Sequence, residues 1–261
     1  MLDRLLRTDF HIHTNLSDCG APAATPKAIL KAAQAAGLEA VGFSDHVIIP
    51  AHRLRPAQLR SQVPTRVGEM RVYVGCEADV ISPTELAVDE DFARTLDYVL
   101  VAASHLYEPM TFHPIEGMDL PAMAAYTIGA MNLAIDSGLA DVVVHPFSVP
   151  QGMYTFEQLV AAADPEAISR VGEKAARAGV AVEYSPRRTA RYPDTARWLY
   201  LRLLETGVKI AISSDAHHPR ELGFGESFRA AMDEVLVESL TEDRLWRVED
   251  RVSAGRRGLP V

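Results

Sequence analysis

Five of the nine histidines in this 261-residue sequence stand at the ends of apolar, β-branched segments. They are His13, His46, His105, His145 and His217. His11 joins His13 in a His-x-His pair, and residues two apart on a strand point to the same face, so both imidazoles can bind one ion. The positions of the histidines therefore predict metal chemistry at the ends of the predicted strands.

Carboxylates accompany these histidines. Asp215 lies two residues before His217, which repeats the His-x-His geometry with an oxygen ligand. Glu77 is a charge near the end of an otherwise apolar segment, and Asp18 lies in the first loop. Buried carboxylates and imidazoles in this number are too costly unless they are paired or bind metal. The nine candidate ligands, enough for three four- or five-coordinate ions that share a bridging group, are His11, His13, Asp18, His46, Glu77, His105, His145, Asp215 and His217.

Short apolar segments alternate with longer alanine-rich segments of helical spacing. Strands are predicted at residues 8–14, 40–46, 71–80, 97–105, 141–147, 180–185 and 209–217. Helices are predicted at 25–36, 119–137, 156–178 and 193–206, followed by terminal helices at 226–238 and 242–248. Thr25-Pro26 is typical of a helix start, and Gly138, Gly179 and Gly207 are typical of helix ends.

Seven strands that alternate with helices are typical of parallel β/α units, and this number within one-domain length favours a closed barrel. We therefore predict an α/β protein, a single distorted seven-stranded (β/α)7 TIM-like barrel that forms one domain over residues 1–261. An open doubly wound sheet is the alternative. Catalytic groups of such barrels gather at the carboxyl ends of the strands, where the candidate ligands lie.

At these residues the sequence resembles the polymerase and histidinol phosphatase (PHP) superfamily. The matching segments, in family order, are DFHIHT (9–14) with SD (17–18), FSDH (43–46), GCEAD (75–79), ASH (103–105), HPF (145–147) and SSDAH (213–217). Single motifs are moderately specific, but the full series is highly specific and spans nearly the whole chain. The resemblance implies a distorted seven-stranded barrel that binds two to three divalent ions, which can be zinc, manganese or iron.

The resemblance also implies which residues hold each ion. By position, the first ion is expected at His11, His13, Glu77 and Asp215. The second is expected at Glu77, His105 and His145, with Glu77 as the bridge. The third is expected at Asp18, His46 and His217.

One departure from the family pattern concerns the substrate pocket. Many members carry Glu-Ile-Asn after the sixth strand, whereas this sequence has EYS (183–185) followed by PRR (186–188). Arg187 and Arg188 are candidate phosphate contacts, because a planar guanidinium can bind two phosphate oxygens. His113 and His218 are further candidate substrate contacts.

The resemblance implies metal-dependent hydrolysis of a phosphoester, first of all a small phosphomonoester such as histidinol phosphate or a related metabolite. A hydroxide that bridges the ions of a trinuclear site would attack phosphorus, because metal coordination lowers the pKa of water toward neutrality. Side chains next to the ligands are expected to orient the imidazoles. The candidates for this role are Asp9 and Asp45. Ser44, Ser104 and Ser214 can do the same or satisfy local backbone groups.

Three alternatives stay open. The substrate can be a nucleotide or the 3′ end of a nucleic acid. The chain can also be an amidohydrolase-type enzyme, although many of those need a bridging lysine at a strand end, whereas Lys174 lies in a predicted helix and Lys209 at a strand start. The third alternative is a metal-binding regulatory module without turnover, but such modules tend to lose ligands and none is missing here.

Composition limits the partners and the location. A net charge of −9 argues against an extended basic surface for nucleic acid. No apolar run reaches the roughly 18 residues of a membrane span, and the first residues lack an export signal. The two cysteines imply no disulfide framework. We expect a cytoplasmic protein with a small-molecule substrate, and the sequence does not predict its oligomeric state.

Overall fold

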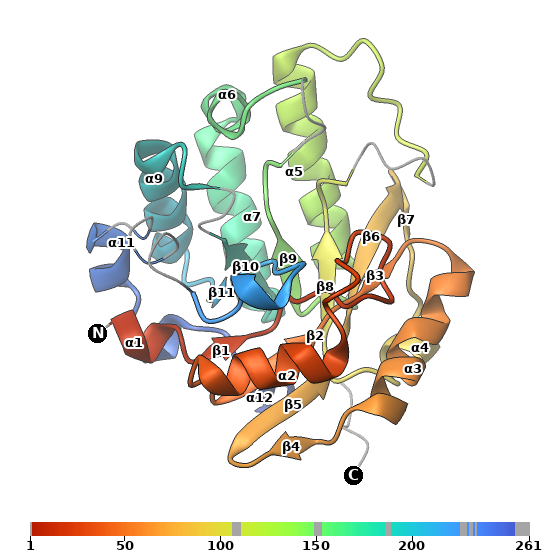
Figure 1. The fold of residues 1–261 in the computed structure, drawn as a ribbon. Coiled ribbons are helices and arrows are strands. Elements are labelled where there is room, and N and C mark those ends of the chain that lie inside the picture. The colour runs from red at the N-terminus through yellow and green to blue at the C-terminus, as the bar shows by residue number, and fades with distance from the viewer. Residues whose placement is uncertain are drawn as a thin grey trace.

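Parallel strands alternate with helices through most of the chain (Figure 1). The structure is a computed structural model that describes residues 2–253, apart from 106–110, 149–152, 186–188, 225–228, 230–231 and 233. One sheet has the order β1 (Thr8–Asp9), β2 (Ala40–Phe43), β5 (Met70–Val74) and β4 (Arg66–Val67). The other has the order β11 (Ile210–Ile212), β10 (Ala181–Tyr184), β9 (Val142–Val144), β8 (Val99–Ala102), β6 (Cys76–Ser82) and β3 (His46–Val47). A short strand, β7 (Glu85–Leu86), pairs antiparallel with β6.

The predicted closed seven-stranded barrel is not confirmed, because the strands form two sheets. Two predicted strands are interrupted and pass from one sheet to the other: β2 continues as β3, and β5 continues as β6 after Gly75. On the opposite side, an isolated parallel bridge joins Ile12 to Ala216. The fold is therefore α/β with mostly parallel strands, and the interruptions divide what the sequence presents as continuous strands.

A buried tyrosine ties the two sheets together. The Tyr98 hydroxyl lies 2.8 Å from Phe10 O and 2.9 Å from Phe43 O and can donate to either carbonyl. A Cβ atom on Gly42 would lie 2.5 Å from this hydroxyl, and one on Gly75 would lie 2.5 Å from Tyr98 O. Glycine at these two positions therefore lets Tyr98 approach the backbone where β5 gives way to β6.

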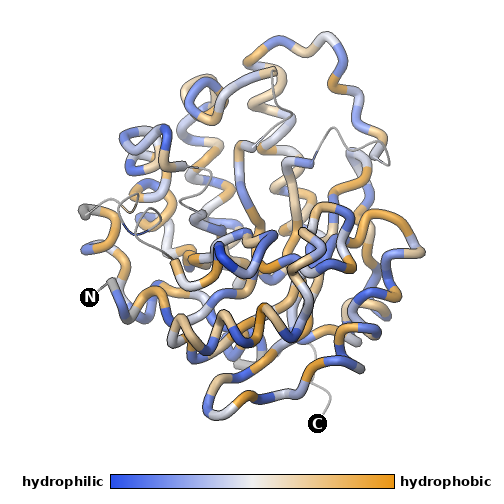
Figure 2. The backbone as a smooth tube through the Cα atoms, viewed as in Figure 1, coloured by the Kyte–Doolittle hydropathy of each residue, from blue (hydrophilic) through white to orange (hydrophobic). Residues whose placement is uncertain are grey.

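Helices cover the outside of the sheets. Beyond β8–β11, α5 (Leu120–Asp136), α7 (Pro165–Ala178) and α9 (Pro193–Glu205) stand in a row (Figure 1). The hydropathy colours alternate along the helices in Figure 2, as expected for helices with one buried side. The helices are α1 (Leu2–Leu5), α2 (Pro26–Ala35), α3 (Leu54–Gln62), α4 (Glu90–Ala93), α5 (Leu120–Asp136), α6 (Phe156–Ala162), α7 (Pro165–Ala178), α9 (Pro193–Glu205), α11 (Glu234–Ser239) and α12 (Val248–Ser253). Short 3-10 helices are η1 (Pro50–Arg53), η2 (Pro219–Glu221) and η3 (Glu242–Arg244). In the described part of the chain, none of the helices has the length and apolar character needed to cross a membrane.

Most predicted helix boundaries are confirmed. Thr25 caps α2 by accepting a hydrogen bond from Ala28 N, and Gly179 ends α7 with a φ of 65°. The single helix predicted over 156–178 is wrong, because Pro165 has no N–H to continue a helix and instead begins α7. Of the helix predicted over 226–238, residues 226–228, 230–231 and 233 lie outside the described residues, and 234–238 lie in α11. The helix predicted over 242–248 is wrong, because the described residues form η3 and then α12.

Candidate metal centre

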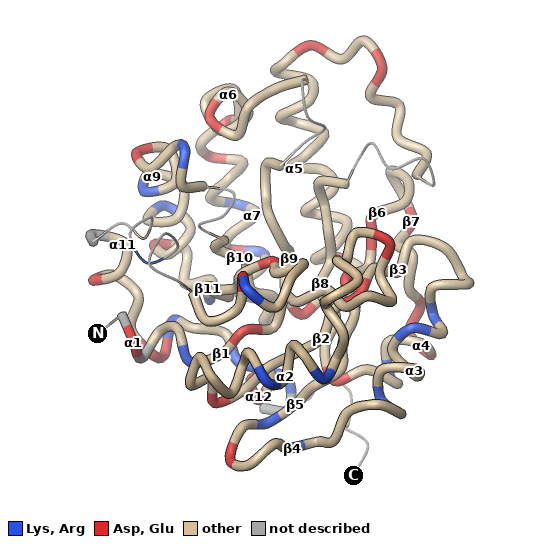
Figure 3. Tube along the Cα trace, viewed as in Figure 1, with Lys and Arg blue, Asp and Glu red and all other residues tan. Residues whose placement is uncertain are grey.

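Eight of the nine predicted ligands converge where the parallel strands end. They are His11, His13, His46, Glu77, His105, His145, Asp215 and His217. Each belongs to a group of three residues whose ligand atoms lie within 4.8 Å of one another. Register explains part of this convergence, because His46 on β3 is paired directly with Glu77 on β6. In Figure 3, acidic segments lie in the middle of the molecule near β6 and β8, whereas Lys and Arg lie on outer helices such as α2, α3 and α9.

One group has the dimensions of a four-coordinate site. The Nε2 atoms of His11 and His13 are 3.1 Å apart, and each lies 3.2 Å from Glu77 Oε2. Asp215 Oδ1 lies 3.6 Å and 3.5 Å from the same two nitrogens. Ligands placed tetrahedrally at about 2.0–2.1 Å from zinc are separated from one another by about 3.3–3.4 Å. The measured separations lie on both sides of this value, so the four side chains can hold one ion with little movement.

Glu77 connects this group to a second one through its other oxygen. Glu77 Oε2 faces His11 and His13, while Glu77 Oε1 lies 2.7 Å from His145 Nε2 and 3.9 Å from His105 Nε2. The carboxylate is almost fully buried at the centre of the cluster. A carboxylate with one oxygen toward each group is arranged as a bridge between two ions.

The Nδ1 atoms of several imidazoles face acceptors that fix the ring orientation. His11 Nδ1 lies 2.6 Å from Glu183 Oε1, and His145 Nδ1 lies 2.7 Å from Ser104 Oγ. His105 Nδ1 lies 3.2 Å from Asp79 Oδ1. A proton on Nδ1 leaves the lone pair on Nε2, which in all three rings is the nitrogen that faces Glu77.

The predicted orienting residues are therefore only partly the observed ones. Ser104 has the expected role, but Asp9 accepts from the backbone of Ser214, and Asp45 accepts from Thr14 N and Thr14 Oγ1. Ser44 contacts the Ile12 backbone, and no hydrogen-bond partner of Ser214 Oγ lies within the described chain. Glu183 and Asp79 were not predicted for this role. Their sequence signal is a carboxylate inside an apolar strand, which Asp79 shows two residues after Glu77 and therefore on the same strand face.

The charges of the cluster are strongly coupled. Burial lowers the pKa of His11, but the carboxylates of Glu183 and Glu77 outweigh it and raise the pKa to about 10. Burial likewise opposes protonation of His46, yet Glu77 and Asp79 raise its pKa to about 10. For Glu77, the positive charges of His46 and His11 overcome burial and hold the pKa well below its usual range. The carboxylates thus attract positive charge into a buried site. Protons on the imidazoles supply this charge when metal ions do not.

Two further observations fit a metal centre. Among the described residues, the buried atoms His13 Nδ1 and Asp79 Oδ2 lack a hydrogen-bond partner, and His46 Nδ1 and Glu77 Oε2 lie 3.3 Å apart without the geometry of a hydrogen bond. His145 and Asp215 have φ values of 31° and 54°, in the left-handed region that side chains other than glycine rarely adopt. Such backbone strain clusters at functional sites and persists where the surroundings hold it. The donor set of imidazoles and carboxylates suits divalent transition metals, so the cluster is able to hold several such ions.

Comparison with known proteins identifies the family. A family model described as the PHP domain matches residues 9–144, more than half of the 261 residues. The chain belongs to the PHP domain family.

Two relatives illustrate how far the similarity of this PHP domain extends. It is 27% identical over 237 residues to a protein of Deinococcus radiodurans named a probable histidinol-phosphatase, covering 83% of this chain and 88% of the relative. It also resembles the crystal structure of a histidinol phosphate phosphatase from Lactococcus lactis in complex with zinc, L-histidinol and phosphate. That comparison has a TM-score of 0.61 and 15% identity and covers 89% and 92% of the two chains, so it concerns the fold.

In this PHP domain, Asp18 does not join the cluster. Its side chain is 75% exposed, and its carboxylate pairs with Arg55 Nη2 at 3.0 Å. Arg55 also donates to His46 O at 3.0 Å, which holds Asp18 outside the ring of ligands. The neighbouring Cys19 takes the inward position and groups with His13 and His217. The sequence signal for Cys19 was its place between a predicted ligand and Gly20, in a loop that follows the His-x-His pair.

The four predicted substrate contacts of the PHP domain differ from one another in their surroundings. His113 is half-buried and bound on both sides, with Nδ1 2.8 Å from Tyr126 Oη and Nε2 2.7 Å from Val80 O. His218 caps η2 by accepting a hydrogen bond from Arg220 N. Arg187 and Arg188 lie outside the described residues.

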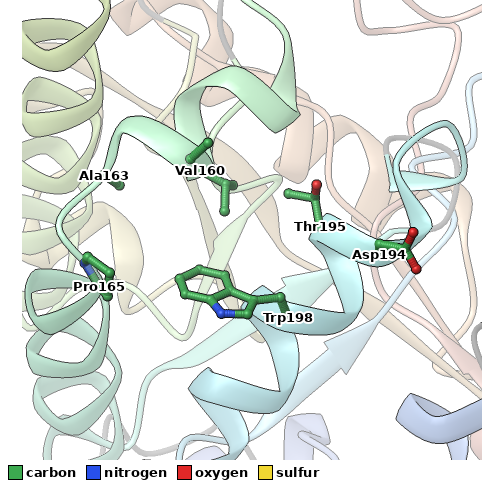
Figure 4. A pocket seen from close by; sticks show the side chains of 7 residues that line it. Val160, Ala163, Pro165, Asp194, Thr195 and Trp198 are labelled. Carbon is green, nitrogen blue, oxygen red and sulfur yellow. The ribbon is translucent and has the colours of Figure 1, made fainter.

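A separate apolar cavity of about 350 Å³ lies between α6, α7 and α9 (Figure 4). Val160, Pro165 and Trp198 line it, together with Asp194 and Thr195 at one side. None of these residues belongs to the metal-ligand groups. The cavity therefore does not form part of the candidate metal centre of the PHP domain.

Proposed function

We propose that this PHP domain is a metal-dependent phosphatase that hydrolyses a small phosphomonoester, with histidinol phosphate or a related metabolite as the first candidate. The observation that carries the proposal is Glu77, whose two oxygens face two imidazole groups. The similarity to proteins named as histidinol phosphatases supports the substrate class. We further propose that residues 1–261 act as one domain and that the site is trinuclear.

The residues divide into holding and orienting roles. His11, His13 and Asp215 would hold one ion with Glu77, and His105 and His145 would hold the second with the same carboxylate. When bound, divalent ions lower the pKa of water toward neutrality and stabilise charge on phosphoryl oxygens.

The protein itself fixes the protons and the geometry. Glu183 and Ser104 keep the protons of His11 and His145 on Nδ1, so both Nε2 lone pairs point into the cluster. Glu77, Glu183 and Asp215 are almost fully buried, and the low dielectric around them strengthens their attraction for cations. The result is a preorganised site for divalent cations, and the bound cations would in turn attract a phosphate dianion to an acidic protein.

The amidohydrolase alternative lacks its bridging lysine in this structure. Lys174 Nζ pairs with Asp136 and Asn132 on the outer helices, and Lys209 Nζ pairs with Asp250. Lys27 and Lys31 lie on α2. Both are exposed, so none of the four lysines is placed as a bridging ligand.

The test is phosphate release by chelator-stripped protein to which zinc or manganese is restored. The substrates are histidinol phosphate, a sugar phosphate, a mononucleotide and one phosphodiester. Glu77→Gln is the inactivating variant, and Glu85→Gln, on the partly exposed strand β7, is the matched control. We expect metal-dependent release from a monoester that Glu77→Gln loses and Glu85→Gln retains.

Other outcomes identify the alternatives. Preference for the mononucleotide or the diester would move the substrate to the nucleotide class. No release with either metal, from folded protein that holds two or more ions, would contradict the phosphatase proposal and favour a regulatory module.

A further inference from the structure

The loop that follows the His-x-His pair is fixed on both sides to metal-ligand segments. Ser17 Oγ accepts a hydrogen bond from His46 N at 3.3 Å, and Ala21 N donates to His217 O at 2.9 Å. Gly20 N donates to Ser17 O, and a Cβ atom on Gly20 would lie only 1.9 Å from Thr14 O. Only glycine permits this tight turn, and the turn places residue 19 between the two fixed points.

The side chains at positions 18 and 19 therefore point in opposite directions. Asp18 faces outward to Arg55, whereas the Cys19 thiol faces the imidazoles of His13, His217 and His46. The ligand atoms of Cys19, His13 and His217 lie within 4.8 Å of one another. Ser17 Oγ, 3.5 Å away, is a weak additional contact of the sulfur.

A second observation indicates that this arrangement is a ligand site and not a chance contact of one cysteine. The imidazole of His13, which is grouped with the sulfur, has a buried Nδ1 without a hydrogen-bond partner in the described chain. His13 is fully buried, and its ring stacks on both His46 and His217 at centroid distances of 4.6 Å and 4.4 Å. A thiol grouped with two imidazoles, one of which keeps an unsatisfied buried nitrogen, offers the sulfur and nitrogen donors of a zinc site.

We propose that Cys19 supplies a thiolate ligand, beside His217 and His46, to a third divalent-cation position, and that Asp18 is not a ligand there. The inference rests on the proposed metal-dependent function for the presence of the ions, and it assigns a residue and a selectivity to one of them. A thiolate is a soft ligand that favours zinc, cobalt or iron over manganese and magnesium. This position therefore selects a thiophilic ion, whereas the groups around Glu77 offer only nitrogen and oxygen.

Cobalt is the direct probe, because a thiolate bound to Co²⁺ gives a ligand-to-metal charge-transfer band in the near ultraviolet that does not depend on turnover. Full-length protein is stripped with a chelator, loaded with Co²⁺ and analysed for absorbance and bound-metal stoichiometry. We expect the band in the wild type. Cys19→Ser should lose it and bind the third ion more than about 100-fold more weakly, since even partners of ligands contribute 10- to 100-fold.

Two matched variants separate this inference from its alternatives. Asp18→Asn should keep both the band and the stoichiometry. Cys76→Ala removes the other cysteine sulfur, which is buried in the core on the strand face opposite Glu77, and should also keep the band. A band that survives Cys19→Ser, a cobalt-loaded wild type without the band, or loss of one ion in Asp18→Asn would overturn the inference.

Alkylation gives a second readout that needs no folded variant. Cys19 is exposed and Cys76 is buried, so iodoacetamide modification of native protein reports Cys19. We expect zinc to slow the modification of stripped protein by about tenfold or more, because a metal-bound thiolate is a poor nucleophile, and equal Mn²⁺ to protect far less. Equal rates with and without zinc would overturn the inference. A cobalt band without phosphate release would contradict the proposed function alone.

Discussion

Replacing Glu183 with glutamine should weaken metal binding although Glu183 is not itself a ligand. Glu183 Oε1 accepts from His11 Nδ1 at 2.6 Å, and Glu183 Oε2 accepts from His145 N at 2.7 Å. Both oxygens thus face donors, and Ser213 Oγ also donates to Oε1. In Glu183→Gln, one acceptor becomes an NH₂ group that points at an N–H.

If the NH₂ group faces His11, the imidazole proton must move from Nδ1 to Nε2, which removes the lone pair that would bind the ion. If it faces the backbone N–H of His145, two donors lie within 2.7 Å and the strained turn at His145 must shift. Loss of such an orienting partner costs about 10- to 100-fold in metal affinity, or about 1.4–2.7 kcal/mol. We therefore expect zinc affinity to fall within this range at constant pH.

The assay is competition between the protein and a chelating dye for zinc, with circular dichroism to confirm folding. Glu166→Gln is the matched control, because Glu166 pairs with Arg202 on the surface and its loss should leave the affinity unchanged. A folded Glu183→Gln variant with wild-type zinc affinity would refute the argument that the Nδ1 proton of His11 sets the ligand nitrogen.

Three further predictions concern the metal, the pH and the core. Stripping the ions should lower the melting temperature by roughly 5–10 °C, because a ligand at 100 times its Kd contributes about 2.7 kcal/mol to the free energy of unfolding. An unchanged melting temperature would contradict this prediction. Zinc affinity should rise from pH 7 toward pH 10, because the carboxylates raise the pKa of His11 and His46 to about 10 and the imidazoles must lose protons to bind. In the metal-free protein, the raised pKa of these two imidazoles stabilises the fold fully below pH 6.5, and this contribution is lost above pH 10. Calorimetry of zinc binding in two buffers that shows no proton release would refute this account. Tyr98→Phe should reduce the free energy of unfolding by about 1–3 kcal/mol without changing zinc stoichiometry, as measured by urea denaturation. An unchanged midpoint would mean that the hydroxyl contacts with Phe10 O and Phe43 O contribute nothing.

The strand positions could be predicted because buried parallel strands are continuously apolar, and the 142–144 and 98–103 segments show this directly. The pairing between strands could not. The interruption at Gly75 depends on its contact with Tyr98, and the two residues meet only when the sheets have assembled. The isolated bridge between Ile12 and Ala216 likewise joins residues whose relation no local pattern records.

The residues of the site were likewise predictable where the signal is local and not where it depends on tertiary contacts. Histidines at strand ends are a local signal, and all six predicted imidazoles lie in the cluster. Asp18 and Cys19 are adjacent in a loop, and which of them points inward depends on the turn at Gly20 and on its contacts with His46 and His217. Those contacts are tertiary, so the sequence alone favoured the carboxylate.

The bridge between Ile12 and Ala216 has a consequence for protein synthesis. Asp215 and His217 leave the ribosome about 200 residues after His11 and His13, a delay of roughly 10–40 s at typical elongation rates. During that interval the nascent chain carries an incomplete chelating pair that can capture a cation loosely or in the wrong coordination. Selection of the correct metal must therefore wait until the last strand has joined the first.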